Sequence, residues 1–424
     1  MKKIFLALSV TTAIYAQTIP ELFNALKSHS QTKSDEMAVK KAEVFNEVVY
    51  SQLYPKIDLF ATYDNYSSPT SMLPVPPDIL VHLVQNPAKP AQPFSYNIYK
   101  AGAKFSMPIY VKSIYTTAKK AKALQESAKA KKHINLLTNE AIIVGANANM
   151  AYLDALQKAL NLKEKSLLET KKTVQIKVDN GRSPASTLYK INDGLNQISI
   201  ARNNIDIQKK KITSTIQSLT GMIINKPINM EQIATYKDGV LASLQPVREK
   251  IRADRLGIEV EKEKLYPTLV ARGNYAYSRG LAYNNHDNVN EEYGNIGVVL
   301  NIPIFDKSQS SEIKLAKIEL KSNEIKLQKL TDELNAKAKM LKESLPLLDN
   351  SKRLYEKSVK DKKELLKIAK VNFNVGRLST EEYLRYEDDV VSAEANLYKT
   401  EASKWETLMQ LAVIYANNIE EIVK

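Results

Sequence analysis

Residues 293–320 read YGNIGVVLNIPIFDKSQSSEIKLAKIEL, and the spacing of the apolar residues changes within this stretch. Apolar residues first recur at every second position, at Ile296, Val298, Leu300 and Ile302, which is typical of a strand with one apolar face. They then recur at every seventh position, at Ile313, Leu320, Leu327, Leu334, Leu341 and Leu348, which is the heptad pattern of coiled coils. The stretch therefore predicts a strand that leads into a long helix over 307–374.

The same arrangement occurs earlier in the chain, so the sequence contains two copies of one unit. Three motifs recur: Leu53-Tyr54-Pro55 as Leu265-Tyr266-Pro267, Pro108-Ile109-Tyr110 as Pro303-Ile304-Phe305, and Gly181-Arg182 as Gly376-Arg377. For the second and third motifs, 303 minus 108 and 376 minus 181 both give 195, whereas the first is offset by 212. The 17 additional residues lie between Pro55 and Pro108, in a proline-rich segment that we interpret as a loop. We assign the first repeat to 17–240 and the second to 241–424.

Each copy opens with two segments in which apolar or aromatic residues alternate with polar ones. These predicted strands cover about 56–66 and 96–107 in the first copy, and about 268–278 and 293–302 in the second. Their length of about ten residues suits tilted strands that cross a bilayer. The alternative is a small sheet in a water-soluble domain. Four strands cannot close a membrane barrel, so the membrane interpretation requires two chains with eight strands or three chains with twelve.

A long helical hairpin follows each pair of strands. The outgoing helices cover about 111–180 and 307–374, each a rod of roughly 100 Å, and we expect Pro346 to kink the second one. The hairpin tips lie at about 180–184 and 375–379, where Gly181 and Gly376 suit a left-handed conformation. In the first tip Ser183 and Pro184 are predicted to start the return helix. In the second tip Ser379 and Glu382 form the pattern of a capping box.

The return paths are expected to consist of two stacked helices. In the first copy they cover 184–221 and about 243–264, with a break at 221–240 that should form a belt part-way along the rod. In the second copy, residues 380–416 followed in space by 18–52 should take the same path.

The composition and the N-terminus restrict the class of protein. Residues 1–16 combine a basic start with a short apolar run, which predicts a signal peptide, and an N-terminal membrane anchor is the alternative. The absence of cysteine excludes disulfides and a lipid-modified cysteine. The formal charge of +14 is mixed with acidic residues along the helices, as in residues 119–132, which indicates solvated faces rather than nucleic-acid binding.

Residues typical of catalysis are scarce. The four histidines have no metal-ligand spacing, and there is no phosphate-binding loop or nucleophile elbow. We therefore predict no catalytic residues, no metal and no cofactor, and we do not expect an enzyme.

In their order and spacing, the duplicated motifs resemble the TolC family of outer-membrane efflux proteins. The resemblance covers nearly the whole mature chain and rests on the L-x-P strand entries, the P-[IL]-[FY] strand exits and the tip Asn372-Phe373-Asn374-Val375-Gly376-Arg377. It implies a mainly α fold with a small β part, in which a trimer forms a 12-stranded β-barrel continued by a 12-helix α-barrel. It further implies a channel in the outer membrane of a Gram-negative bacterium, with a long periplasmic extension. This channel would be the passive exit duct of a tripartite efflux or type I secretion system. Its partners would be a periplasmic adaptor and an inner-membrane RND or ABC transporter.

The resemblance also points to residues at the tips. The family narrows its periplasmic end with acidic residues, and the matching positions here are Glu382 and Arg385. Arg385 departs from the family pattern by placing a cation where the family has an acid. A Glu–Arg pair between neighbouring helices is therefore an alternative to the double acidic ring that the resemblance implies. The capping box explains Glu382 equally well. The resemblance implies an adaptor-docking edge at Gly181, Arg182, Gly376 and Arg377.

An exported coiled-coil scaffold or adhesin is the main alternative to a channel. Such a protein would share the heptads and the signal peptide, but it would not need two pairs of membrane-length strands. A periplasmic adaptor is a third candidate, but it would contain a single hairpin, in conflict with the two-fold repeat.

Overall fold

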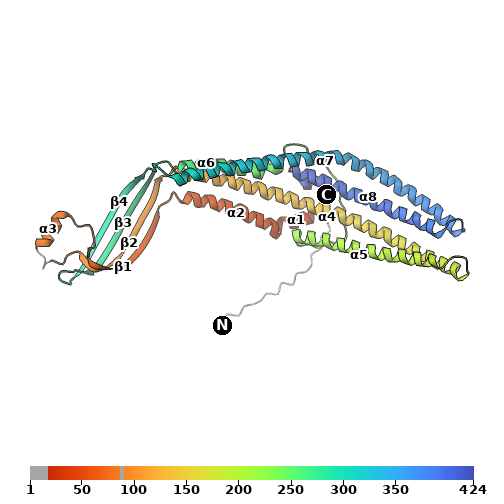
Figure 1. Cartoon of the computed structure of the whole chain (residues 1–424), viewed down its shortest axis with the longest axis horizontal. Coiled ribbons are helices and arrows are strands. Elements are labelled where there is room, and N and C mark those ends of the chain that lie inside the picture. Colours follow the sequence, from red (N-terminus) through yellow and green to blue (C-terminus); the bar gives the residue numbers. More distant parts are fainter. Residues whose placement is uncertain (1–17, 86–89) are drawn as a thin grey trace, which may run out of the picture. The chain divides into compact units, whose positions relative to one another are not determined.

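The computed structural model describes residues 18–85 and 90–424, so the predicted signal peptide over 1–16 lies outside the described residues. Helices and strands follow one another in the order predicted for two repeats (Figure 1). Their bounds are α1 Ile19–Ser28, α2 Ser30–Ser51, β1 Lys56–Ser71, α3 Pro77–Gln85, β2 Phe94–Tyr110, α4 Lys112–Asp179, α5 Ser186–Thr220, the short helix η1 Ala242–Leu244, α6 Gln245–Glu263, β3 Thr268–Leu281, β4 Asn288–Asn301, α7 Lys307–Asn374, α8 Thr380–Ile414 and η2 Ile419–Glu421.

The predicted fold class, mainly α with a small β part, is confirmed. The outgoing helices α4 and α7 each have 68 residues, and the return helices α5 and α8 each have 35. Helix α7 is continuous through Pro346. None of the helices in residues 18–85 and 90–424 combines the length and apolarity needed to span a bilayer.

The structure differs from the sequence interpretation in the proline-rich segment, which contains the helix α3 where a loop was expected. Pro77 is the first residue of this helix, a position where the missing backbone N–H of proline has no cost. Asp78 lies in the first turn, where a negative charge is favourable. The strands also run longer than predicted, since β1 extends to Ser71 and β2 begins at Phe94.

The chain divides into two compact units that do not follow the two repeats. The helical unit comprises the residues up to Val39, Ser127–Val247 and Lys326–Lys424, and the strand unit comprises Lys40–Glu126 and Arg248–Ile325. Each unit therefore combines segments from both repeats.

Within the helical unit, α4 and α5 pack as a coiled coil. Their buried side chains recur at every seventh position, with Leu153, Leu160, Leu167 and Val174 on α4 and Ile191, Ile198 and Ile205 on α5. On α7, Leu341 is buried, and Leu330 and Leu334 pack against the cluster around Leu244 and Ile414. A second apolar series on α7, at Met340, Leu347 and Leu354, is more than half exposed. The central leucines of the predicted heptad, Leu327, Leu334 and Leu341, thus pack inside the chain. The second series is left mostly uncovered by the described residues.

The segment between α5 and α6 is held to α4 and to the end of the chain. The buried Asn147 side chain donates a hydrogen bond to Ile228 O at 2.7 Å and accepts one from Ile228 N at 2.8 Å. Glu231 and Lys424 exchange two backbone hydrogen bonds, of 3.0 and 3.1 Å. Residues 221–240 are therefore a non-helical strap with defined contacts, as expected for the predicted break in the return path.

The strand unit holds one antiparallel sheet in the order β1-β2-β3-β4 (Figure 1). Among the described residues, β1 pairs only with β2 and β4 pairs only with β3, so both outer edges are open. Gly102, on β2, marks the closest approach between strands, because a Cβ there would lie 2.1 Å from Tyr275 O on β3.

We predict that Gly102→Ala destabilises the sheet by about 2 kcal/mol, because the new methyl group must push β2 away from β3. Gly297→Ala is the matched control, since nothing lies within 4 Å of a Cβ at that strand position. Thermal unfolding followed by circular dichroism measures both variants. Equal melting temperatures for the two variants would contradict the close approach.

Glu140 is a buried carboxyl group on α4, only 2% exposed. Burial, together with the nearby Glu420 carboxylate, raises its pKa to about 7, although Lys27 opposes the shift. Lys27 and Glu420 form an ion pair at 2.5 Å. The folded chain therefore retains a proton on Glu140 at pH values where the unfolded chain has released it.

This pKa has a definite consequence for stability. The protonated Glu140 side chain contributes to the free energy of unfolding. This contribution is fully present below the ordinary carboxyl pKa of 4.5, and it is lost as the pH rises through the folded-state pKa of about 7. We predict that Glu140→Gln, which mimics the protonated form, raises the free energy of unfolding by about 2 kcal/mol at pH 8 and has little effect at pH 4.5. The exposed Glu343→Gln serves as control, and urea unfolding at both pH values provides the measurement. A pH-independent effect of Glu140→Gln would rule out the raised pKa.

Candidate functional site

The sheet has two unlike faces. Its register places one set of apolar and aromatic side chains on the same face: Ile57, Leu59, Tyr63, Tyr99, Met107, Tyr275, Tyr277, Ile296, Val298 and Leu300. These side chains point to solvent in the isolated chain, and Leu59 and Ile296 are 84% and 85% exposed. The four tyrosines lie toward one end of this face, and the rings of Tyr63 and Tyr99 are 4.8 Å apart. We call this surface the apolar face.

The opposite side of the sheet, the polar face, carries charged residues from all four strands. They are Lys56, Asp58, Asp64, Lys100, Lys104, Arg272 and Glu291. This division agrees with the strand alternation read from the sequence. An exposed apolar face opposite a charged face is typical of strands between lipid and water.

Within the helical unit, both hairpin tips line one cavity of about 1060 Å³. The structure brings the predicted residues Arg182, Glu382 and Arg385 together in its wall. Gly181, Gly376 and Arg377 belong to the turns but do not line the cavity.

Both tip glycines adopt the left-handed conformation that the sequence predicted, with φ of 69° at Gly181 and 75° at Gly376. The residue after each glycine closes the turn, since Arg182 N–H donates to Lys177 O at 2.7 Å and Arg377 N–H donates to Asn372 O at 2.8 Å. These bonds satisfy carbonyl groups at the ends of α4 and α7.

Glu382 forms the predicted capping box with Ser379. The Ser379 N–H donates to Glu382 Oε2 at 3.0 Å, and the Glu382 N–H donates to Ser379 Oγ at 3.2 Å. Hydrogen bonds from the Ser379 side chain and backbone lower the pKa of Glu382, and the positive charge of Arg385 acts in the same direction. Glu382 is therefore held as a carboxylate at the start of α8.

The first tip departs from the prediction. Ser183 does not cap the return helix, because α5 begins at Ser186, after Ala185, and has no side-chain cap. The turn instead starts with backbone bonds from Thr187 N to Pro184 O and from Leu188 N to Ala185 O. These two carbonyl groups accept the first N–H groups of the turn, so the serine hydroxyl is not needed as a cap.

Several contacts that join the two hairpins were not predicted from the sequence. Lys190 pairs with Glu381 at 2.8 Å, and Lys163 pairs with Asp388. The hydroxyl groups of Ser166 and Tyr383 are 2.9 Å apart. No local pattern marks these partners, because each pair joins different repeats.

Glu387 lies beside this contact and is 4% exposed. Burial raises its pKa, whereas the hydroxyl groups of Ser166 and Tyr383 and the charge of Lys163 counteract the shift. The Tyr383 ring stacks on Phe373 at 4.8 Å, so α8 is also anchored to the end of α7. The contacts of Tyr383 therefore join α8 both to Ser166 on α4 and to the end of α7.

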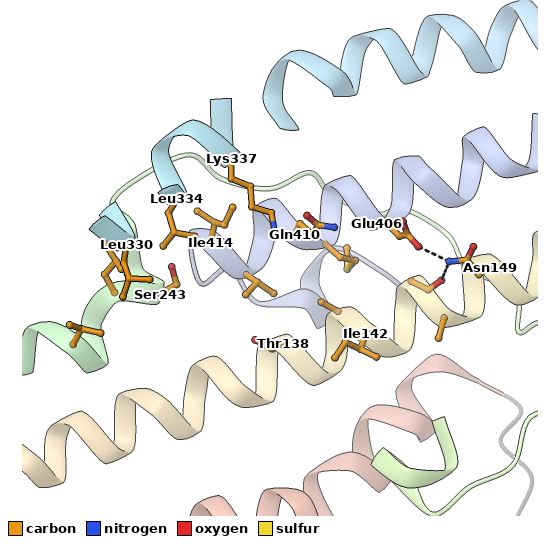
Figure 2. Close-up of a pocket in the computed structure, with 17 residues that line it drawn as sticks. Thr138, Ile142, Asn149, Ser243, Leu330, Leu334, Lys337, Glu406, Gln410 and Ile414 are labelled. Carbon is orange, nitrogen blue, oxygen red and sulfur yellow. Dashed lines mark hydrogen bonds between the residues drawn. The ribbon is translucent and has the colours of Figure 1, made fainter. Parts of the chain in front are cut away.

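A further cavity of about 600 Å³ lies between α4, α7, α8 and η1 (Figure 2). Its walls are mainly apolar, and the Asn149 amide donates to Glu406 Oε1 at 2.6 Å and to Gly145 O at 3.1 Å at one end. Ser243 Oγ is buried there and has no hydrogen-bond partner among the residues that the structure describes. Within the described part of the chain, no group of three or more His, Asp or Glu side chains could hold a metal ion.

No family model and no curated protein matches the chain. Solved structures do match at low identity. The CmeC outer membrane channel of Campylobacter jejuni has a TM-score of 0.76 and 16% identity, covering 98% of this chain and 90% of that chain. The outer membrane protein VceC of Vibrio cholerae has a TM-score of 0.72 and 13% identity, covering 94% and 96%. The open MtrE outer membrane channel of Neisseria gonorrhoeae has a TM-score of 0.72 and 12% identity, covering 94% and 89%. The chain therefore has the fold of these outer-membrane channels, the TolC-like fold that its sequence resemblance implies.

Proposed function

We propose that three copies of this chain form a channel in the outer membrane of a Gram-negative bacterium. The observation that carries the proposal is a sheet with two open edges, one exposed apolar face and one charged face. Unpaired strand edges are not tolerated in lipid, so β1 of one copy must pair with β4 of the next. Twelve strands from three copies would close a barrel with the apolar face toward lipid and the polar face toward water.

The helices support the same assembly. The exposed apolar series on α7, at Met340, Leu347 and Leu354, requires cover from another chain, and a heptad spacing suits a neighbouring helix. Three copies of the four long helices would give a 12-helix tunnel that continues the barrel. The number three follows from the resemblance to the TolC family, because edge closure alone allowed two or three chains.

We further propose that this channel is the passive exit duct of a tripartite efflux or type I secretion system. A periplasmic adaptor would dock at the tips around Gly181, Arg182, Gly376 and Arg377, and an inner-membrane RND or ABC transporter would supply energy. Glu382 and Arg385 line the tip cavity and are the candidates for a periplasmic gate.

An exported coiled-coil scaffold is the competing function. It would account for the hairpins, but it gives no reason for aliphatic side chains such as Leu59 and Ile296 to be exposed together on one sheet face. Exposed apolar patches of this kind mark surfaces that contact lipid or another protein.

The neighbouring residues Asn295 and Ile296 test the two faces directly. We expect Ile296→Lys to reduce the outer-membrane trimer strongly, because a lysine in the lipid costs about 2–4 kcal/mol near the middle of the bilayer. Asn295→Lys, on the polar face, should leave it unchanged. Membrane fractionation and heat-modifiable bands on gels measure the trimer. Equal recovery of both variants, or a water-soluble monomer in the unmodified protein, would contradict the channel.

The gate assignment has its own test in planar bilayers. We predict that replacing both Glu382 and Arg385 with alanine raises the single-channel conductance and changes its ion selectivity, because both charges leave the tip. Ser379→Ala removes the cap but keeps both charges, so its conductance should stay at the unmodified level. If the double variant conducts like the unmodified channel, these residues do not form the gate.

A further inference from the structure

A cavity of about 480 Å³ lies on the polar face of the sheet, within the strand unit. Polar side chains from three strands line it: Lys100 and Lys104 on β2, Asn274 and Ser278 on β3, and Tyr293 on β4. Residues 71–74, which comprise the last residue of β1 and the three that follow it, also line the cavity. None of these residues belongs to the tip site.

Packing and hydrogen bonds hold residues 71–74 in place. Met72 is 4% exposed and packs in a cluster with Ile98 and Val289, which lie on the polar face of the sheet. Its N–H donates to Pro93 O at 2.9 Å, and the Ser278 hydroxyl donates to its carbonyl oxygen at 3.5 Å. The cavity therefore has a wall held by both backbone and side-chain contacts.

The charge inside the cavity is uncompensated. Lys100 and Lys104 are four residues apart along β2, so both project from the same face of the strand, and no acidic residue lines the cavity. Among the described residues neither lysine has a carboxylate within 4.0 Å. The Lys104 ammonium lies 4.8 Å from the centre of the Phe60 ring, an interaction that leaves its charge available for a ligand.

The acidic groups of the polar face lie outside the cavity lining. Asp58 stands opposite Lys104 in the strand register, Asp64 accepts a hydrogen bond from the Thr62 hydroxyl at 3.1 Å, and Glu291 stands opposite Ser278. The lining itself therefore carries two positive charges.

Asn274 provides the second indication of a ligand. Its side-chain oxygen is buried and has no hydrogen-bond partner among residues 18–85 and 90–424, which is uncommon for a buried polar group. The oxygen and nitrogen of an asparagine amide exchange places when the group turns over. In the turned orientation, the amide would present two N–H donors to an anion held by the lysines.

We propose that this cavity binds a small divalent anion, a phosphate or a dicarboxylate, between the ammonium groups of Lys100 and Lys104. The position of the site inside the pore rests on the proposed channel, whereas binding itself does not. In the closed barrel the site would lie on the water-filled side, at the middle of β2 and beside the start of the β1–β2 connection. It would delay and select anionic cargo there.

Isothermal titration of the purified full-length protein in detergent tests binding without requiring a pore. Sodium phosphate and sodium succinate are titrated separately at constant ionic strength, which distinguishes the two anion classes. Replacing both Lys100 and Lys104 with glutamine should weaken binding at least about tenfold, the effect of losing charge-assisted hydrogen bonds. Lys56→Gln, a charge change on the same face outside the cavity, should leave binding unchanged. Replacing both lysines with arginine keeps both positive charges and should preserve binding. This control shows that the weaker binding of the double glutamine variant comes from lost charge and not from a loss of fold.

Block of the single-channel current by the same anions tests the position in the pore. The double glutamine variant should need about ten times more anion for half block than the unmodified channel does. Equal affinity and equal block in the unmodified and double glutamine proteins would overturn the site, as would binding of neither anion. If the protein binds an anion but opens no pores, the channel proposal fails while the site stands.

Discussion

The unpaired backbone groups along the outer edges of β1 and β4 are the constraint on which the rest of the structure depends. Each edge presents N–H and C=O groups that water can satisfy but hydrocarbon cannot. Because the exposed apolar face of the same sheet favours hydrocarbon, one chain cannot meet both demands. Association with further copies meets both, since new strand pairs form at the edges while the apolar face stays outside.

The duplication provides the parts for such an assembly but does not define the folded units. Segments of both repeats make up the helical unit, and segments of both make up the strand unit. Contacts such as Lys163 with Asp388 and Ser166 with Tyr383 join hairpins of different repeats. The two copies are therefore interlocked through contacts between their hairpins.

Local periodicity and turn chemistry were readable from the sequence because they depend on near neighbours. The alternation around Ile296, the left-handed glycines and the capping box at Ser379 are of this kind. The partners Lys190 and Glu381 could not be predicted, because no pattern relates side chains so far apart in the chain. The helix α3 was missed because its prolines resemble a loop, although Pro77 stands where a helix tolerates it. The gate and docking roles stay predictions, since they concern neighbours that a single chain does not include.

The equal lengths of α4 and α7, at 68 residues each, limit how such a chain can change over evolution. The tips at the ends of these helices share one cavity and are tied together by cross-repeat contacts. Deleting one heptad from each helix of a single hairpin would withdraw its tip by about 10 Å. Lengthening or shortening would then be tolerated only when both hairpins change by the same number of turns, so the two halves must acquire insertions and deletions in concert.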